Sequence, residues 1–109
     1  MEKDTHKTDV IFRKDTTKDF KGQIYALFPH NVETYDGDVM FYTHVGQHDS
    51  ADYNHCINTS KLATETEYKD LKNELESIGY NLNIIKKQNH KKYLKSYYEA
   101  YGVINLLKK

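Results

Sequence analysis

The first part of the chain carries short runs of β-branched and aromatic residues at 9–13 (Asp-Val-Ile-Phe-Arg) and 23–28 (Gln-Ile-Tyr-Ala-Leu-Phe), separated by a polar segment. Runs of this length and composition are typical of β-strands, and two in succession predict an antiparallel pair. Pro29 is predicted to end the second strand, because proline cannot donate a hydrogen bond to a β-ladder. A third strand is predicted at 39–43, after a turn in which Gly37 supplies a positive φ.

The second half of the chain changes to a helical pattern. Thr64 and Glu67 have the spacing of a capping box, in which each side chain accepts a backbone N–H at the start of a helix. Four apolar residues then recur at helical spacing, Tyr68, Leu71, Leu75 and Ile78. Gly79 is placed to end this helix, a strand is predicted at 80–85, and Asn89 is a candidate N-cap for a last helix. The predicted apolar line of that helix is Leu94, Tyr97, Tyr101 and Ile104.

The order of these elements is three strands, an irregular loop at 44–59, then helix, strand and helix. This order predicts an α+β fold with a mainly antiparallel sheet of three to four strands and two helices packed on one face. A length of 109 residues allows one domain. Residues 1–8 are polar throughout and expected to be disordered, so the domain is expected to span 9–109 and to end in a basic helix at 86–109.

The formal charge of zero, from 16 basic and 16 acidic residues, hides an uneven distribution. Residues 86–109 contain seven lysines and one glutamate, a charge of 7 − 1 = +6, so residues 1–85 carry −6. The zero total excludes a uniformly basic nucleic-acid binder, whereas the acidic body is suited to a partner with a basic surface. The candidate partner-contacting residues are Asp36, Asp38, Asp49 and Asp52.

No stretch approaches the ~20 apolar residues of a membrane span, and the first nine residues lack the pattern of a signal peptide. We therefore expect a soluble, cytoplasmic monomer that does not bind membranes. The lone Cys56 cannot form an internal disulfide, so any chemistry of its own would be that of a metal ligand or a thiolate.

The predicted loop holds three of the six histidines together with this cysteine. Imidazole and thiolate are the usual protein ligands of zinc, which prefers four ligands in a tetrahedron. The candidate zinc ligands are His44, His48, His55 and Cys56, with Asp52 as a substitute. The alternative is a polar loop whose histidines hydrogen-bond to its own backbone and whose Cys56 is a small buried apolar residue.

Catalytic motifs are absent from the sequence, which contains no G-x-S-x-G, no H-E-x-x-H and no glycine-rich phosphate loop. We therefore predict no catalytic residues and no enzymatic activity. One alternative is a metal-dependent hydrolase centred on His44 and His48, in which a histidine acts as general acid or base.

The last predicted helix interleaves lysines with tyrosines, a pattern that can place cations and stacking rings against a nucleic-acid strand. The candidate contacts are Lys91, Lys92 and Lys95. The interpretation we favour is that Leu94, Tyr97 and Tyr101 belong to the core and that the lysines form a solvated face.

Several stretches carry a resemblance: 10–14 (Val-Ile-Phe-Arg-Lys), 26–29 (Ala-Leu-Phe-Pro), His44-Val-Gly-Gln-His48, and 63–68 (Ala-Thr-Glu-Thr-Glu-Tyr) leading to 74–80 (Glu-Leu-Glu-Ser-Ile-Gly-Tyr). Together they resemble a family of small proteins carried by bacteriophages and mobile elements of gut and low-GC Gram-positive bacteria. The resemblance covers about residues 10–86, and the His-Val-Gly-Gln-His motif is its most specific part.

The chain also looks like the type II-A anti-CRISPR proteins of streptococcal prophages. This resemblance implies a non-enzymatic inhibitor that binds Cas9 and prevents target DNA from loading, with any metal serving the fold. Residues 88–109 lie outside the shared pattern, so the basic helix is expected to be a lineage-specific addition.

Overall fold

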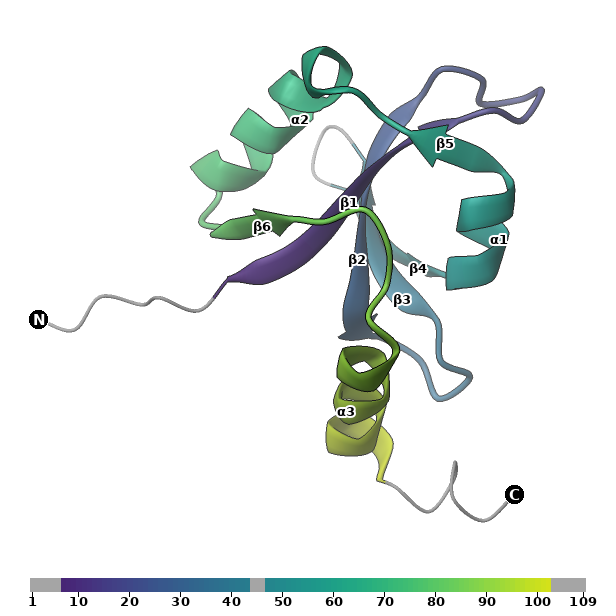
Figure 1. The fold of residues 1–109 in the computed structure, drawn as a ribbon, viewed down its shortest axis with the longest axis vertical. Helices are drawn as coiled ribbons and strands as arrows, with labels where there is room; N and C mark the ends of the chain where they lie inside the picture. The colour runs from purple at the N-terminus through teal and green to yellow at the C-terminus, as the bar shows by residue number, and fades with distance from the viewer. Residues whose placement is uncertain (1–6, 44–46, 103–109) are drawn as a thin grey trace, which may run out of the picture.

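The structure is a computed structural model that describes residues 7–43 and 47–102. Its elements are β1 (Thr8–Asp15), β2 (Ile24–Val32), β3 (Val39–Thr43), β4 (Gln47–Ala51), α1 (Tyr53–Asn58), β5 (Ser60–Leu62), α2 (Glu65–Ser77), β6 (Leu82–Ile84) and α3 (His90–Tyr101) (Figure 1). The strands form one six-stranded sheet of order β4-β3-β2-β1-β5, in which β6 pairs with β1. The β1–β6 pair is parallel and the other pairs are antiparallel. The predicted α+β fold with a mainly antiparallel sheet is confirmed, but the part of the chain that the structure describes has six strands instead of three to four and three helices instead of two.

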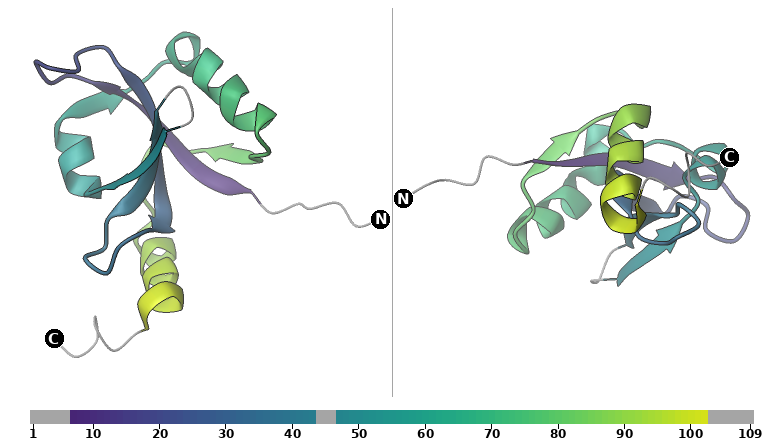
Figure 2. Two further views of the ribbon diagram at one scale, coloured as in Figure 1. Left: turned by 180° about the vertical axis from the view of Figure 1, so that it is seen from behind. Right: turned by 90° about the horizontal axis from the view of Figure 1, so that it is seen from below.

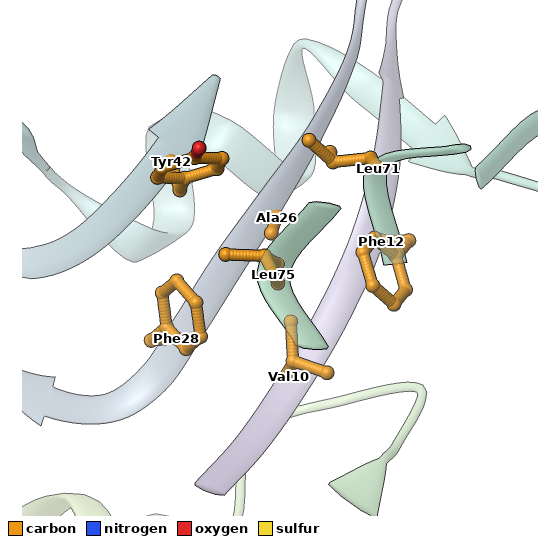
Figure 3. Packing of buried hydrophobic residues seen from close by; sticks show 7 residues of the cluster. All are labelled: Val10, Phe12, Ala26, Phe28, Tyr42, Leu71 and Leu75. Atoms are coloured by element: carbon orange, nitrogen blue, oxygen red, sulfur yellow. The ribbon is translucent and has the colours of Figure 1, made fainter. Parts of the chain in front are cut away.

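Both faces of the sheet are covered, which corrects the prediction that the helices pack on one face. On one face, α2 places Leu71 and Leu75 against alternate residues of β1, β2 and β3, which are Val10, Phe12, Ala26, Phe28 and Tyr42 (Figure 3). On the other face, Cys56 of α1 and Tyr97 of α3 pack with Ile11, Leu27 and Val39. Figures 1 and 2 accordingly show α1 and α2 on opposite sides of the strands. The central strands are apolar at consecutive positions because both of their faces are buried.

Pro29 does not end the second strand, since β2 continues to Val32. The register against β3 explains how the proline is tolerated: from the pair Phe28–Met40 to the pair Val32–Val39, β2 advances four positions and β3 only one. Pro29 lies in this β-bulge, where its missing N–H leaves no ladder hydrogen bond unmade. The Pro29 carbonyl accepts a hydrogen bond from the Gln88 side chain at 2.9 Å.

The segment 44–59 is not an irregular loop where the structure describes it. Residues 44–46 lie outside the described residues, but β4 pairs in continuous register with β3, and α1 and β5 follow it. These elements were missed because β4 is an edge strand and α1 buries only Cys56, so neither shows an apolar repeat. Asp52 caps α1, and its carboxylate accepts the His55 backbone N–H at 3.1 Å.

Helix α2 begins at the predicted capping box, with Thr64 as its N-cap, and Gly79 has the expected positive φ of +113°. Leu71 and Leu75 are buried as the periodicity predicts. Ile78 is not: its side chain is 55% exposed, and α2 ends one residue before it, at Ser77.

The last two elements are shorter than predicted. Strand β6 covers Leu82–Ile84 of the predicted 80–85, and α3 starts after its predicted N-cap Asn89 and ends at Tyr101. Strand β1 begins at Thr8, inside the segment that was expected to be disordered. Ile104 lies outside the described residues. Among the helices described, none is long and apolar enough to cross a membrane.

Candidate binding pocket

The predicted zinc ligands that the structure describes come from separate elements, β4 for His48 and α1 for His55 and Cys56. His44 lies outside the described residues. His48 pairs with Tyr42 across β3 and β4 and its ring contacts the Tyr42 ring at a centroid distance of 4.6 Å. The His48 Nε2 atom lies 3.1 Å from the Tyr80 hydroxyl oxygen, on the face covered by α2.

Cys56 belongs to the opposite face, where burial raises the pKa of its thiol and favours the protonated form. His55 is exposed on α1, and Asp52 is engaged as the cap of that helix. Within residues 7–43 and 47–102, no group of three or more His, Cys, Asp or Glu side chains is placed to hold a metal ion. The zinc site, which would need His44, stays a prediction.

An open pocket of about 810 Å³ lies on the α1 face of the sheet, between α1, the β1–β2 hairpin and the ends of the strands. This volume is within the range of about 300–1,000 Å³ typical of ligand sites. Three carboxylates line it, Asp15, Asp19 and Asp49, together with three aromatic side chains, Phe20, Tyr25 and Phe41. Three of the predicted zinc ligands, His48, His55 and Cys56, also line it, whereas no lysine or arginine of the described chain does.

The aromatic side chains of β2 and β3 lie between the carboxylates. The rings of Tyr25 and Phe41 meet edge to face at a centroid distance of 5.9 Å. Tyr25 is buried, and burial raises the pKa of its phenol, so the ring is uncharged at neutral pH. Asp15 lies on β1 and Asp49 on β4, three strand spacings or about 14 Å apart across the sheet. The register places Asp49 level with Ile11, so Asp15 also lies four residues further along β1.

A buried arginine fixes the wall of the pocket without lining it. Arg13 of β1 is 6% exposed, and its guanidinium donates to the Ser60 hydroxyl at 2.7 Å and to the Ser60 carbonyl at 2.8 Å. The Ser60 hydroxyl in turn donates to the Cys56 carbonyl at 2.5 Å. These bonds hold the end of α1 against β1. Arg13 therefore positions Cys56 and its neighbours beside the pocket.

Three tyrosines of α3 attach this helix to the connection between β2 and β3. Tyr93, Tyr97 and Tyr101 lie four residues apart, and each hydroxyl donates to a backbone carbonyl of the β2–β3 connection. In this order, the acceptors are the carbonyl of Gly37 for Tyr93 at 3.0 Å, that of Tyr35 for Tyr97 at 2.8 Å and that of Glu33 for Tyr101 at 3.0 Å. Tyr97 is buried, as predicted, and α3 is an integral part of the second core cluster. Lys91, Lys92 and Lys95 are exposed on the same helix.

His30 connects the bulge of β2 to α3. Its Nε2 atom accepts the Asn89 backbone N–H at 2.7 Å, so the ring proton is on Nδ1, which donates to the Asp9 carboxylate at 2.8 Å. Lys92 Nζ also lies 3.1 Å from that carboxylate. Burial lowers the pKa of His30 and outweighs the opposing effect of Asp9. Burial alone would raise the pKa of Asp9, but its hydrogen bonds to Asn83, Lys92 and His30 lower it overall.

We expect stability to fall as the pH decreases below the ordinary histidine pKa of about 6.5. The unfolded chain then takes up a proton at His30 more readily than the folded chain does, so acidification favours unfolding. Denaturant titrations at pH 7.5, 6.5 and 5.5 measure this. His30→Gln should flatten the pH dependence and His90→Gln, on the exposed part of α3, should leave it unchanged. An identical pH profile in His30→Gln would contradict the prediction.

Of the four predicted partner-contacting residues, only Asp49 lines the pocket. Asp52 caps α1, and Asp36 and Asp38 lie in the connection between β2 and β3. Asp15, Asp19, Tyr25 and Phe41 were missed; the nearest signal for the carboxylates is the acidic charge of residues 1–85. No protein-family model matches the chain, and neither a curated protein nor a solved structure shows a significant match to it.

Proposed function

We propose that the chain is a non-enzymatic protein-binding factor that inhibits a nucleic-acid-handling partner by occupying a basic surface of that partner. The observation that carries this proposal is the pocket on the α1 face, whose lining, among the residues described, has three carboxylates and two histidines but no lysine or arginine. Charge complementarity of this kind speeds association and selects partners of opposite charge.

Cas9 is the partner to which the resemblance points, and the inhibitor would act as a monomer in the host bacterial cytoplasm. All pocket-lining residues lie between positions 15 and 59, inside the part of the chain (10–86) that carries the resemblance. By contrast, α3 lies outside that part. The pocket would cover a surface of Cas9 that otherwise receives target DNA, and a zinc ion, if bound by the predicted ligands, would serve the fold.

Mixing the purified chain with guide-loaded Cas9 tests the proposal. We expect the two proteins to co-elute in size-exclusion chromatography and DNA cleavage to be suppressed at near-equimolar ratios. Because loading of DNA is the blocked step, inhibition should be strong when the chain is added before target DNA and weak when it is added afterwards. Unaffected cleavage at large excess, with no complex, would contradict the proposal.

The exposed lysines of α3 favour one alternative, direct binding of nucleic acid. Lys91, Lys92 and Lys95 are exposed, although Lys92 lies beside Asp9 and the tyrosines nearby are engaged by the fold. A mobility-shift assay with labelled DNA at low salt, without Cas9 and on the same protein preparation, distinguishes direct nucleic-acid binding from inhibition through Cas9. For the hydrolase alternative, the described contacts of His48 are with Tyr42 and Tyr80, and neither is a carboxylate that could orient a catalytic base.

A further inference from the structure

We infer that His30 is a pH-sensitive switch that holds residues 88–92 on β2 while its ring is neutral and releases them when its ring is protonated. The sheet and the rest of α3 stay in place. This inference is independent of the proposed function. It gives the expected loss of stability in acid a location, the junction between β6 and α3.

The hydrogen bonds of His30 require one particular protonation state. Its Nε2 atom accepts the Asn89 backbone N–H at 2.7 Å, and its Nδ1–H group donates to the Asp9 carboxylate at 2.8 Å. An imidazolium carries a proton on both nitrogens and accepts no hydrogen bond. Protonation therefore sets an N–H group of His30 against the N–H group of Asn89, and one of the two must move.

His30 and Asp9 are both fixed in the sheet. His30 lies in β2, and Asp9 pairs with Asn83 across β1 and β6 and accepts a hydrogen bond from its side chain at 2.8 Å. Asn89 instead belongs to residues 85–89, which connect β6 to α3 and form neither helix nor strand (Figure 1). We therefore expect protonation to displace Asn89 and to leave His30 in place.

The bonds on either side of Asn89 set the extent of the opening. Gln88 donates its backbone N–H to the Tyr53 hydroxyl at 2.9 Å and its side chain to the Pro29 carbonyl at 2.9 Å. Farther along, the tyrosine hydroxyls of α3 bond to the β2–β3 connection without involving His30. The opening is therefore confined to residues 88–92. Because Tyr53 belongs to α1, it also removes a contact of the helix that lines the pocket.

Charged groups reach the His30 ring from two elements. They line an open pocket of about 480 Å³ beside it and are Lys7 and Asp9 at the start of β1, and Lys92, Lys95 and Glu99 on α3. On β3, the other neighbour of β2, the nearest residues in register are Val39 and Met40, which carry no charge.

These surroundings keep the switch closed at neutral pH. Burial lowers the pKa of His30, Asp9 opposes this effect, and the charge of Lys92 adds to it. With a lowered pKa, the ring takes up its proton only below the ordinary histidine pKa of about 6.5. The Asp9 carboxylate stays ionised in this range, because its hydrogen bonds lower its pKa despite burial.

Amide hydrogen exchange of the full-length, ¹⁵N-labelled chain at pH 7.5 and 5.0, corrected for the intrinsic exchange rate, tests the inference. We expect protection of the Gln88 and Asn89 amides to fall by about two- to tenfold in acid, the contribution of one hydrogen bond. Their exchange should be insensitive to urea below the unfolding transition, because a local opening exposes little surface. The most protected amides of β1 and β2 should instead show the full urea dependence of global unfolding.

His30→Gln removes the titrating group and should make the protection of these two amides independent of pH. The matched control is His90→Gln, which removes an exposed histidine next to Asn89 and should preserve the whole change. The same loss of protection in His30→Gln would overturn the inference. So would exchange of the Asn89 amide at pH 5.0 with the full urea dependence, since the segment would then open only when the domain unfolds.

The wild-type chain gives a second measurement that does not depend on the folding of a variant. The ¹⁵N shifts of the His30 ring report its protonation, and the Asn89 amide proton reports the bond to Nε2. Both should change with one midpoint. Separate midpoints, or an Asn89 amide that does not shift while the ring titrates, would overturn the inference.

Discussion

Replacing Leu75 by alanine is expected to lower the free energy of unfolding by about 2–5 kcal/mol, the range measured for buried leucines. Leu75 is fully buried and packs in the cluster formed by α2 with β1, β2 and β3 (Figure 3). The substitution removes apolar contacts and leaves a cavity between α2 and the sheet. Since small domains are stable by only about 5–15 kcal/mol, this is a large part of the total. The midpoint of urea unfolding, at unchanged slope, measures the loss.

Ile78→Ala is the matched control, because it lies one helical turn further along the same apolar line. Its side chain is 55% exposed, so the change in stability should stay within about 0.5 kcal/mol. A loss as large as that of Leu75→Ala would show that Ile78 is buried, as the periodicity alone predicts, and that the chain beyond Ser77 packs differently.

Leu75 and Ile78 show which contacts of a helix a periodic sequence pattern can predict. The capping box fixed the start of α2 within one residue, and the three- to four-residue spacing identified Leu71 and Leu75. The same spacing did not predict where the helix ends, because it continues to Ile78. Helix α2 ends at Ser77, Gly79 has a φ of +113°, and Ile78 between them is exposed. Local sequence therefore predicted the contacts made inside the element but not those at its boundary.

Strand β4 and helix α1 show the opposite case. Their residues are mostly polar, because β4 pairs on only one side and α1 presents a single buried residue, Cys56, to the sheet. What makes β4 a strand is its pairing with β3, which is a tertiary contact and leaves no alternation in the sequence. The same absence of pattern made the segment look like a loop that gathers metal ligands.

The pocket could not be predicted for a related reason. Asp15 and Asp49 are 34 positions apart in sequence (49 − 15), and only the order β1-β2-β3-β4 brings them to one face. Charge asymmetry indicated that the body is acidic, and of the four candidate partner contacts only Asp49 lines the pocket. The register of the sheet decides which carboxylates share a pocket, and register depends on pairings that composition does not specify.

Replacing Gly37 by alanine is expected to cost about 2–3 kcal/mol, the second large effect. Gly37 has φ +95°, and a left-handed backbone costs a residue with a side chain roughly 1–2 kcal/mol. The added Cβ would also collide with the Tyr93 hydroxyl, which donates to the Gly37 carbonyl at 3.0 Å. Displacing that hydroxyl removes a hydrogen bond worth about 0.5–1.5 kcal/mol and loosens α3 from the β2–β3 connection.

Gly22→Ala separates the two contributions. Gly22 has a similar φ of +90° in the β1–β2 hairpin, but a Cβ there would meet no atom within 4 Å, so only the backbone cost of roughly 1–2 kcal/mol applies. In a Tyr93→Phe background, which lacks the colliding hydroxyl, the cost of Gly37→Ala should fall to that of Gly22→Ala. Urea unfolding of the four variants measures this coupling. If Gly37→Ala costs no more than Gly22→Ala in the wild-type background, the Tyr93 hydroxyl does not hold the turn, which would contradict this prediction.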